Sequence, residues 1–240
     1  GIPYKDQDKI GVILSYISID GEGGFPGTLH TSVEYTLDKN NNFSIHIKSR
    51  TDRSTIINIT NHSYFNLSNC EDTILDHEIY VDAKGFCELD KELIPTGMII
   101  EDNSFDFKNP HTLLDEVIKN SKHLICGGID HPFVLGETKT IELSHKGSGR
   151  CMRISSNQPV CVIYTSNILG ADQRFRRGIK GEKYLGICFE MQDYPDYINQ
   201  KNFPTKIYTP SDEYTNKIKF DFSILKDQHI IPKACDIIIS

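Results

Sequence analysis

Three side chains in this chain are suited to proton transfer or hydrogen bonding at a small ligand: His62, Asp130 and Glu190. His62 follows the apolar, β-branched run 55–60, which predicts a buried strand. Histidine donates and accepts protons near neutral pH, so His62 could act as an acid or a base. A single histidine at a strand end more often has a structural role, and this stretch alone does not decide between the two.

Glu190 lies within an apolar run, on the strand face opposite Phe189 and Met191. A carboxylate there must face solvent or have partners that offset its burial. In a cleft, desolvation would raise its pKa towards that of a useful general base. A histidine and a carboxylate on opposite sides of a small ligand can act as acid and base without metal or cofactor. Spacing alone does not place Glu190 near His62.

Asp130 and His131 stand between a glycine pair and a predicted strand, where binding residues are commonly displayed. The alternative is a turn in which Asp130 accepts hydrogen bonds from nearby backbone amides. Taken alone, the turn is the better interpretation.

The elements around these residues are predicted to be almost entirely β. Residues 29–37 and 43–47 alternate with a period of two and are joined by the turn 38–42, which predicts an antiparallel pair. One helix is predicted, at 111–120, and 94–97 reads as a turn. We therefore expect an all-β fold, a large antiparallel β-sandwich, with residues 1–240 forming a single domain.

Bulk composition excludes several classes of function. The net charge of −7 argues against general binding to nucleic acid or anionic membranes, and no apolar run is long enough to span a bilayer. Seven scattered cysteines without a Cys-x-x-Cys pair predict a reduced, cytoplasmic protein, and the histidines show no metal-binding spacing. The basic run 174–180 is expected to be a solvated loop.

Six stretches, in order, resemble the aldose 1-epimerase (galactose mutarotase) family. They are Asp20-Gly21-Glu22-Gly23-Gly24-Phe25-Pro26-Gly27, Thr60-Asn61-His62-Ser63-Tyr64-Phe65-Asn66-Leu67, Ile94-Pro95-Thr96-Gly97, Gly128-Ile129-Asp130-His131-Pro132-Phe133, Tyr164-Thr165-Ser166-Asn167 and Glu190-Met191-Gln192-Asp193-Tyr194-Pro195-Asp196. The resemblance covers most of the chain and implies a galactose mutarotase-like sandwich with an open sugar cleft.

The resemblance also implies roles for individual residues. His62 matches the family's general acid, Glu190 its general base, and Asp130 the aspartate that binds sugar hydroxyls. Further candidate substrate-binding residues in the same stretches are Asn61, Tyr64 and Gln192, with packing as the alternative for Tyr64. No metal or cofactor is implied.

Family members usually carry an N-terminal portion that supplies an arginine and a further histidine for sugar binding. Only nineteen residues precede Asp20, and they contain neither. We expect a fragment of a longer protein; a natural short form and a divergent member without catalysis are the alternatives. The shortened sandwich predicts uncovered sheet edges and exposed apolar surface, which would favour self-association.

The leading hypothesis is an aldose 1-epimerase that interconverts the α and β anomers of hexoses such as galactose and glucose. One alternative is a non-catalytic carbohydrate-binding protein. The other is a sugar-phosphate (hexose-6-phosphate) 1-epimerase, for which the basic run 174–180 is the only reason.

Overall fold

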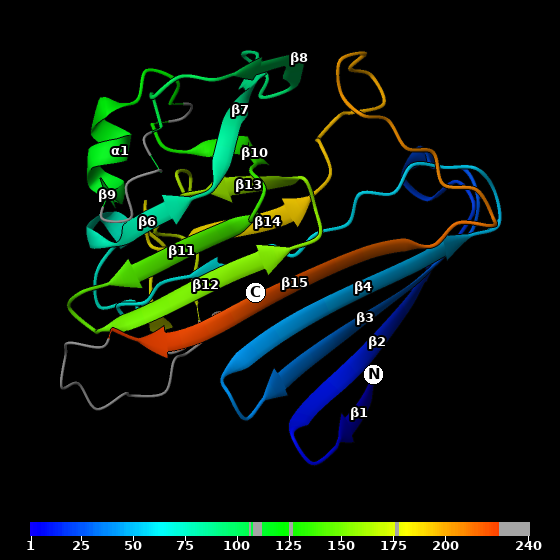
Figure 1. Ribbon diagram of the computed structural model, residues 1–240, viewed down its shortest axis with the longest axis horizontal. Helices are drawn as coiled ribbons and strands as arrows, with labels where there is room; N and C mark the ends of the chain where they lie inside the picture. Colours follow the sequence, from blue (N-terminus) through cyan, green and yellow to red (C-terminus); the bar gives the residue numbers. More distant parts are fainter. Residues whose placement is uncertain (106, 108–111, 125–126, 176–177, 226–240) are drawn as a thin grey trace.

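The computed structural model describes residues 1–105, 107, 112–124, 127–175 and 178–225. Within these residues, two antiparallel sheets form the frame of the fold (Figure 1). The nine-stranded sheet contains, in spatial order, β1 (Ile2–Lys5), β2 (Lys9–Ser18), β3 (Leu29–Asp38), β4 (Asn42–Thr51), β15 (Tyr214–Ile224), β12 (Arg150–Ser156), β11 (Thr140–His145), β6 (Glu78–Val81) and β9 (Thr112–Leu113). The six-stranded sheet contains β5 (Tyr64–Phe65), β14 (Ile187–Gln192), β13 (Val160–Tyr164), β10 (Asp130–Leu135), β7 (Ala83–Leu89) and β8 (Pro95–Ile100). The predicted antiparallel sandwich is confirmed.

The predicted hairpin between residues 29 and 47 forms β3 and β4. Its register runs from Leu29 opposite Thr51 to Leu37 opposite Phe43. In the connecting turn the Asp38 carboxylate accepts hydrogen bonds from the backbone of the residues that follow, at 2.8 and 3.0 Å. An Asp at this position satisfies amides that the strands cannot, which is why the chain reverses there.

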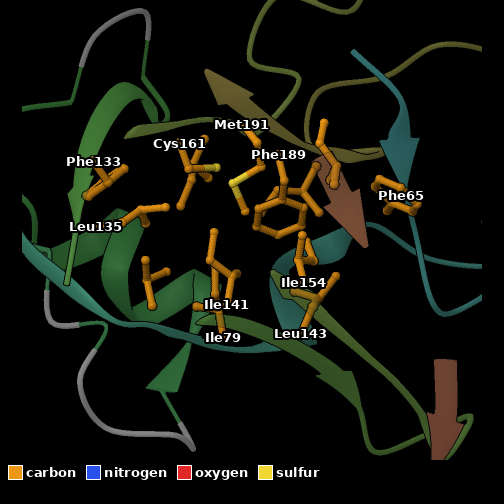
Figure 2. Packing of buried hydrophobic residues seen from close by; sticks show 14 of the residues in the cluster. Phe65, Ile79, Phe133, Leu135, Ile141, Leu143, Ile154, Cys161, Phe189 and Met191 are labelled. Atoms are coloured by element: carbon orange, nitrogen blue, oxygen red, sulfur yellow. The ribbon is translucent and has the colours of Figure 1, made fainter. Parts of the chain in front are cut away.

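The inner faces of the two sheets meet in an apolar core (Figure 2). Ile141 and Ile154 come from the nine-stranded sheet, Phe133 and Phe189 from the six-stranded sheet, and all four are almost fully buried. Burying a side chain of this size stabilises a fold by roughly 1.5–3 kcal/mol. Because Phe189 belongs to this core, the period of two along β14 turns Glu190 to the outer face, as predicted.

The run 55–60 does not form the buried strand that its composition predicts. Thr55 makes an isolated bridge with Tyr208, and the rest of the run pairs with no strand of the described sheets. The reason lies at Ile59, whose N–H and C=O are hydrogen-bonded to the Tyr214 hydroxyl at 3.0 and 2.7 Å. Side-chain groups from β15 therefore take the place of a ladder partner. The burial of Ile57 does follow the prediction.

Two other predicted boundaries were wrong. The described helix, α1 (Leu114–Asn120), starts later than residue 111, because Thr112 and Leu113 pair with β6 as the short strand β9; residue 111 lies outside the described residues. The turn predicted at 94–97 ends at Ile94, and Pro95 opens β8. Asp90 fixes the earlier position, since its carboxylate accepts hydrogen bonds from two backbone amides of that turn.

Apolar side chains of β2 and β3 remain exposed at one end of the nine-stranded sheet. Ile10 and Leu14 share a face with Phe43 and Ile47 through the pairing of β2, β3 and β4, yet they are 51% and 44% exposed. Figure 1 shows these strands, in blue, extending away from the six-stranded sheet. The expected exposed apolar surface is present, and self-association stays a prediction. No helix among the described residues has the length and hydrophobicity to cross a membrane.

Candidate active site

His62 and Glu190 are brought together by the pairing of β5 with β14. Tyr64 pairs with Cys188 and Phe65 with Ile187 in an antiparallel register. Residues on antiparallel strands face each other one to one, so continuing this register two residues back places His62 opposite Glu190. The sheet thus supplies the proximity that the sequence spacing could not.

The side chains of His62 and Glu190 are in direct contact. Nε2 of His62 lies 3.3 Å from Oε1 of Glu190, and the two side chains are 51% and 14% exposed. Burial raises the pKa of Glu190 to about 6; His62 opposes the rise and the Asp130 carboxylate adds to it. The carboxylate is therefore ionised at neutral pH and only weakly acidic when protonated, which suits a general base.

Asp130 lies on the same outer face, across two strand intervals. It pairs with Tyr164 of β13, and Tyr164 pairs with Cys188 of β14. With neighbouring strands roughly 4.8 Å apart, the backbones of Asp130 and β14 are separated by on the order of 10 Å. Burial raises the pKa of the Asp130 carboxyl, while His62 acts in the opposite direction. The strand register puts Asp130 on the face that carries Glu190, and its carboxyl interacts electrostatically with both His62 and Glu190.

Two tyrosines border the imidazole of His62. The ring centroids of Tyr64 and Tyr164 lie 5.2 and 6.0 Å from that of His62, and 6.2 Å from each other. Burial raises the pKa of Tyr64 to about 12, so its hydroxyl stays protonated and can donate a hydrogen bond. Packing and ligand binding are both compatible with this placement, and the substrate-binding role of Tyr64 stays a prediction.

Asn61 and Gln192 lie beside the pair. The Asn61 Oδ1 atom accepts a hydrogen bond from the Ser63 amide at 3.2 Å, an Asx turn that bends the chain at His62. Gln192 follows Glu190 by two residues on β14 and so projects from the same face. Their roles as sugar ligands stay predictions.

Thr165 and Asn167 hold the backbone that precedes Asp130, a role that sequence spacing did not reveal. The Ile129 amide donates to Thr165 Oγ1 and its carbonyl accepts from Asn167 Nδ2, each at 2.9 Å. Thr165 Oγ1 also donates to Asn167 Oδ1 at 2.6 Å. Gly128 makes room, since a Cβ there would lie 1.8 Å from Asn167 Oδ1. The only indication in the sequence was that residues 164–167 form one of the six stretches that resemble the family.

Asp76, His77 and His145 form a cluster whose potential metal-binding atoms lie within 4.8 Å of one another. The Asp76 carboxylate contacts His77 Nδ1 and His145 Nε2, each at 2.9 Å. The opposite ring nitrogens accept backbone N–H groups, His77 Nε2 from Leu67 and His145 Nδ1 from Ser148. Each imidazole therefore carries its proton on the nitrogen that faces Asp76, which is the nitrogen a metal would need. These residues fit a hydrogen-bonded anchor better than a metal site.

That anchor fixes the end of the stretch that carries His62. Besides the bond from its amide to His77, Leu67 accepts hydrogen bonds at its carbonyl from Ser148 Oγ at 2.8 Å and Arg150 Nη1 at 2.7 Å. The histidines were far apart in the sequence, and only the fold shows their shared contact.

The basic run 174–180 lies partly outside the described residues, which omit positions 176 and 177. Arg174 and Lys180 form an isolated antiparallel bridge, so the two ends of the run lie side by side. Nothing in this arrangement tests the phosphate-binding interpretation.

The fold and the site together define a class of protein: an antiparallel sandwich whose sheet face carries a largely buried glutamate, a histidine in contact with it and an aspartate two strands away. The family model described as aldose 1-epimerase matches residues 3–221, and the chain belongs to that family.

Relatives with established names support this assignment. Galactose mutarotase of Bos taurus is 36% identical over an alignment 221 residues long that covers 89% of this chain and 63% of the relative. Aldose 1-epimerase of Streptococcus thermophilus is 33% identical over an alignment 218 residues long that covers 86% of this chain and 60% of the relative. The chain thus spans less than two thirds of the length of these relatives.

Two solved structures share the fold. An aldose epimerase homologue from C. elegans superposes with a TM-score of 0.82 at 25% identity, over 94% of this chain and 69% of that one. Galactose 1-epimerase from Lactobacillus acidophilus gives 0.80 at 25% identity, over 93% and 65%.

Proposed function

We propose that this protein is an aldose 1-epimerase that interconverts the α and β anomers of hexoses such as galactose and glucose. The observation that carries the proposal is the 3.3 Å contact between His62 Nε2 and Glu190 Oε1 on the same sheet face as Asp130. The names of the relatives, galactose mutarotase and aldose 1-epimerase, support this chemistry over sugar binding without catalysis and over a sugar-phosphate substrate.

In the proposed reaction, the Glu190 carboxylate takes the proton of the anomeric hydroxyl. As C1 becomes a carbonyl, the bond between C1 and the ring oxygen breaks, and that oxygen takes its proton from protonated His62. Rotation about C1–C2 presents the other carbonyl face. Closure then reverses both transfers: His62 recovers its proton from the sugar hydroxyl, and Glu190 returns its proton to the anomeric oxygen. The side chains end as they began, and no other reactant is consumed.

The two side chains touch rather than flank a ligand from opposite sides, and this adjacency also suits the reaction. The two sugar oxygens that exchange protons are bonded to the same carbon, so their acid and base must also lie close together. A proton-transfer group needs to come within roughly 2.6–3.2 Å of its target. Asp130, about two strand intervals away, would hold hydroxyls at the other side of the ring and so fix its orientation.

Polarimetry on freshly dissolved α-galactose or α-glucose tests the proposal. The chain should accelerate the approach to anomeric equilibrium, and Glu190→Gln should abolish the acceleration. Glu142→Gln is a matched control, because Glu142 pairs with Arg153 on the other sheet and should leave the rate unchanged. If Glu190→Gln is as active as the wild type, Glu190 is not the base.

Polarimetry and thermal unfolding together separate the alternatives. A non-catalytic sugar-binding protein would show a saturable rise in thermal stability with sugar and no rate above buffer. A sugar-phosphate epimerase would prefer hexose 6-phosphate to the free hexose. We expect acceleration with the free sugar at least equal to that with the phosphate.

We also propose a reducing compartment such as the cytoplasm. Cys87, Cys151, Cys161 and Cys188 form no disulfide in the described structure, and Cys87, Cys161 and Cys188 are buried. Buried thiols of this kind are common in proteins that are not exposed to oxidising conditions. A free-thiol titration under denaturing, non-reducing conditions of the purified protein should find no disulfide.

A further inference from the structure

The segment before His62 runs beside the end of β14 without forming a backbone ladder. Asn58 exchanges two hydrogen bonds with the backbone of Asp193: its Oδ1 accepts from the amide at 2.9 Å and its Nδ2 donates to the carbonyl at 3.1 Å. Thr60 Oγ1 donates to the Met191 carbonyl at 2.8 Å. Polar side chains thus connect two segments whose main chains are not paired.

Asn216 reaches the same place from the opposite sheet. It lies on β15, faces the interior and is fully buried. Its Nδ2 atom donates to the Ile59 carbonyl at 3.0 Å and to the Met191 carbonyl at 2.7 Å. Two carbonyl acceptors identify this atom as the amide nitrogen and use both of its hydrogens.

The two carbonyls belong to the main-chain segments that carry the proposed acid and base. Ile59 lies three residues before His62, and Met191 directly follows Glu190. Other groups on β15 do not make this connection: the Tyr214 hydroxyl bonds Ile59 at both its amide and its carbonyl. Tyr214 therefore orients one segment, whereas Asn216 joins the two.

We propose that Asn216 is a positioning residue that sets the separation of His62 and Glu190 by tying the Ile59 and Met191 carbonyls to one buried amide. This inference rests on the proposed epimerase reaction. A buried amide with both hydrogens bonded has little freedom to move, and a misplacement of about 1 Å in an active site can lower a rate by roughly 10²-fold. Asn216 acts through the main chain and does not contact the sugar.

The test is Asn216→Leu, which keeps the branched shape and removes both donors. We expect kcat to fall by roughly tenfold or more while KM changes by less than about twofold, because Asp130 and its supporting bonds are not connected to Asn216. The acidic limb of the kcat/KM profile should also shift, since the contact between His62 and Glu190 changes. Loss of a purely structural residue would not shift the acidic limb of the pH profile, and it would not lower kcat while leaving KM unchanged.

Gln158→Met is the matched control. Gln158 is also a buried amide, and its Nε2 donates at 3.0 Å to the carbonyl of Thr215, which lies on β15 beside Asn216. This bond does not involve the segments that carry His62 and Glu190. The variant should lose stability by a similar mechanism while kcat stays within about twofold of the wild type. Thermal unfolding of both variants ensures that rates are compared for folded protein.

Thr60→Val gives a second, milder test, because it removes only the bond to Met191 at a partly exposed position. It should lower kcat by less than Asn216→Leu. Because both side chains act on the same separation, the double variant should lose less than the product of the two single losses.

Four results would overturn the inference. Two concern Asn216→Leu, a wild-type kcat or an effect confined to KM, and the third is an equal loss of kcat in Gln158→Met. The fourth applies where Asn216→Leu does not fold: Thr60→Val then has a wild-type kcat and a wild-type acidic limb. An inactive Glu190→Gln with an active Asn216→Leu removes this inference alone. A fully active Glu190→Gln, or a wild-type chain without acceleration, overturns the proposed function and this inference with it.

Discussion

Nε2 of His62 and Oε1 of Glu190 lie 3.3 Å apart, although the residues belong to different segments and meet only through the register of β5 and β14. The proposed acid and base thus share one electrostatic environment. In that environment burial raises the pKa of Glu190, His62 lowers it and Asp130 raises it further. The rate and the stability of the protein should both depend on this balance.

The pH dependence of the rate follows from the pKa of Glu190, about 6. A base must be ionised to accept a proton, so kcat/KM should be low below pH 5 and rise through an apparent pKa near 6. An unburied glutamate would give a limb near its usual pKa of 4.5. Initial mutarotation rates between pH 4.5 and 7.5 test this, and a kcat/KM that stays constant down to pH 5 would contradict the assigned base.

Asp130→Asn should weaken sugar binding and move the acidic limb downwards. The charge of Asp130 disfavours ionisation of Glu190, so its removal lowers the Glu190 pKa. We expect KM to rise about tenfold or more for the loss of hydrogen bonds to sugar hydroxyls. KM and the pH profile measured on one preparation test both effects. An unchanged KM would remove Asp130 from the sugar site.

Glu190→Gln should stabilise the protein at pH 8. The folded-state pKa of Glu190 is raised from 4.5 to about 6, so the folded protein binds this proton more tightly than the unfolded chain does. The resulting contribution to stability is fully present below the unfolded pKa and is lost as pH rises through 6. At one pKa unit per 1.36 kcal/mol, the carboxylate costs about 2 kcal/mol above pH 7. Urea unfolding should show this gain at pH 8 and little gain at pH 4.5. A variant that is less stable at pH 8 would show that the carboxylate is well compensated.

Acid should destabilise the fold through His77 and His131. Burial lowers the pKa of each to about 4 from a usual 6.5. The stability they confer is present above pH 6.5 and is lost as pH falls towards 4, by about 3 kcal/mol for each histidine. This outweighs the opposite contribution of about 2 kcal/mol from Glu190. The free energy of unfolding should therefore be lower at pH 4.5 than at pH 7. In the variant His131→Leu the difference between these two values should be smaller than in the wild type.

Gly128→Ala should impair the sugar site more than the fold. The added Cβ would overlap Asn167 Oδ1, so Asn167 must give up its bonds to Thr165 and Ile129 or the backbone before Asp130 must shift. Overpacking of this kind costs roughly 1–3 kcal/mol. We expect KM to rise. Gly24→Ala is the control: its Cβ meets no atom within 4 Å, but the positive φ of 84° strains an alanine, so the variant should lose stability and leave KM unchanged.

Much of the fold could be predicted from the sequence. Strands such as β4 and β14 alternate because one face packs on the core, and that period places Glu190 on the outer face. The run 55–60 misled for the same reason: Ile57 is buried, but Tyr214 and Asn216, more than 150 residues away in the chain, satisfy the backbone of Ile59 in place of a partner strand. The local hydrophobic pattern of a sequence predicts which side chains are buried. It does not predict which groups form hydrogen bonds with the backbone.

The sequence by itself determined the types of the reacting groups and the face on which Glu190 stands, because side-chain chemistry and the strand period are local properties. The tertiary structure decided that His62 faces Glu190, that burial raises the pKa of this carboxylate, and that Asn216 joins their two segments. Register, desolvation and long-range hydrogen bonds arise only when distant segments pack together. The proposed reaction depends on all three.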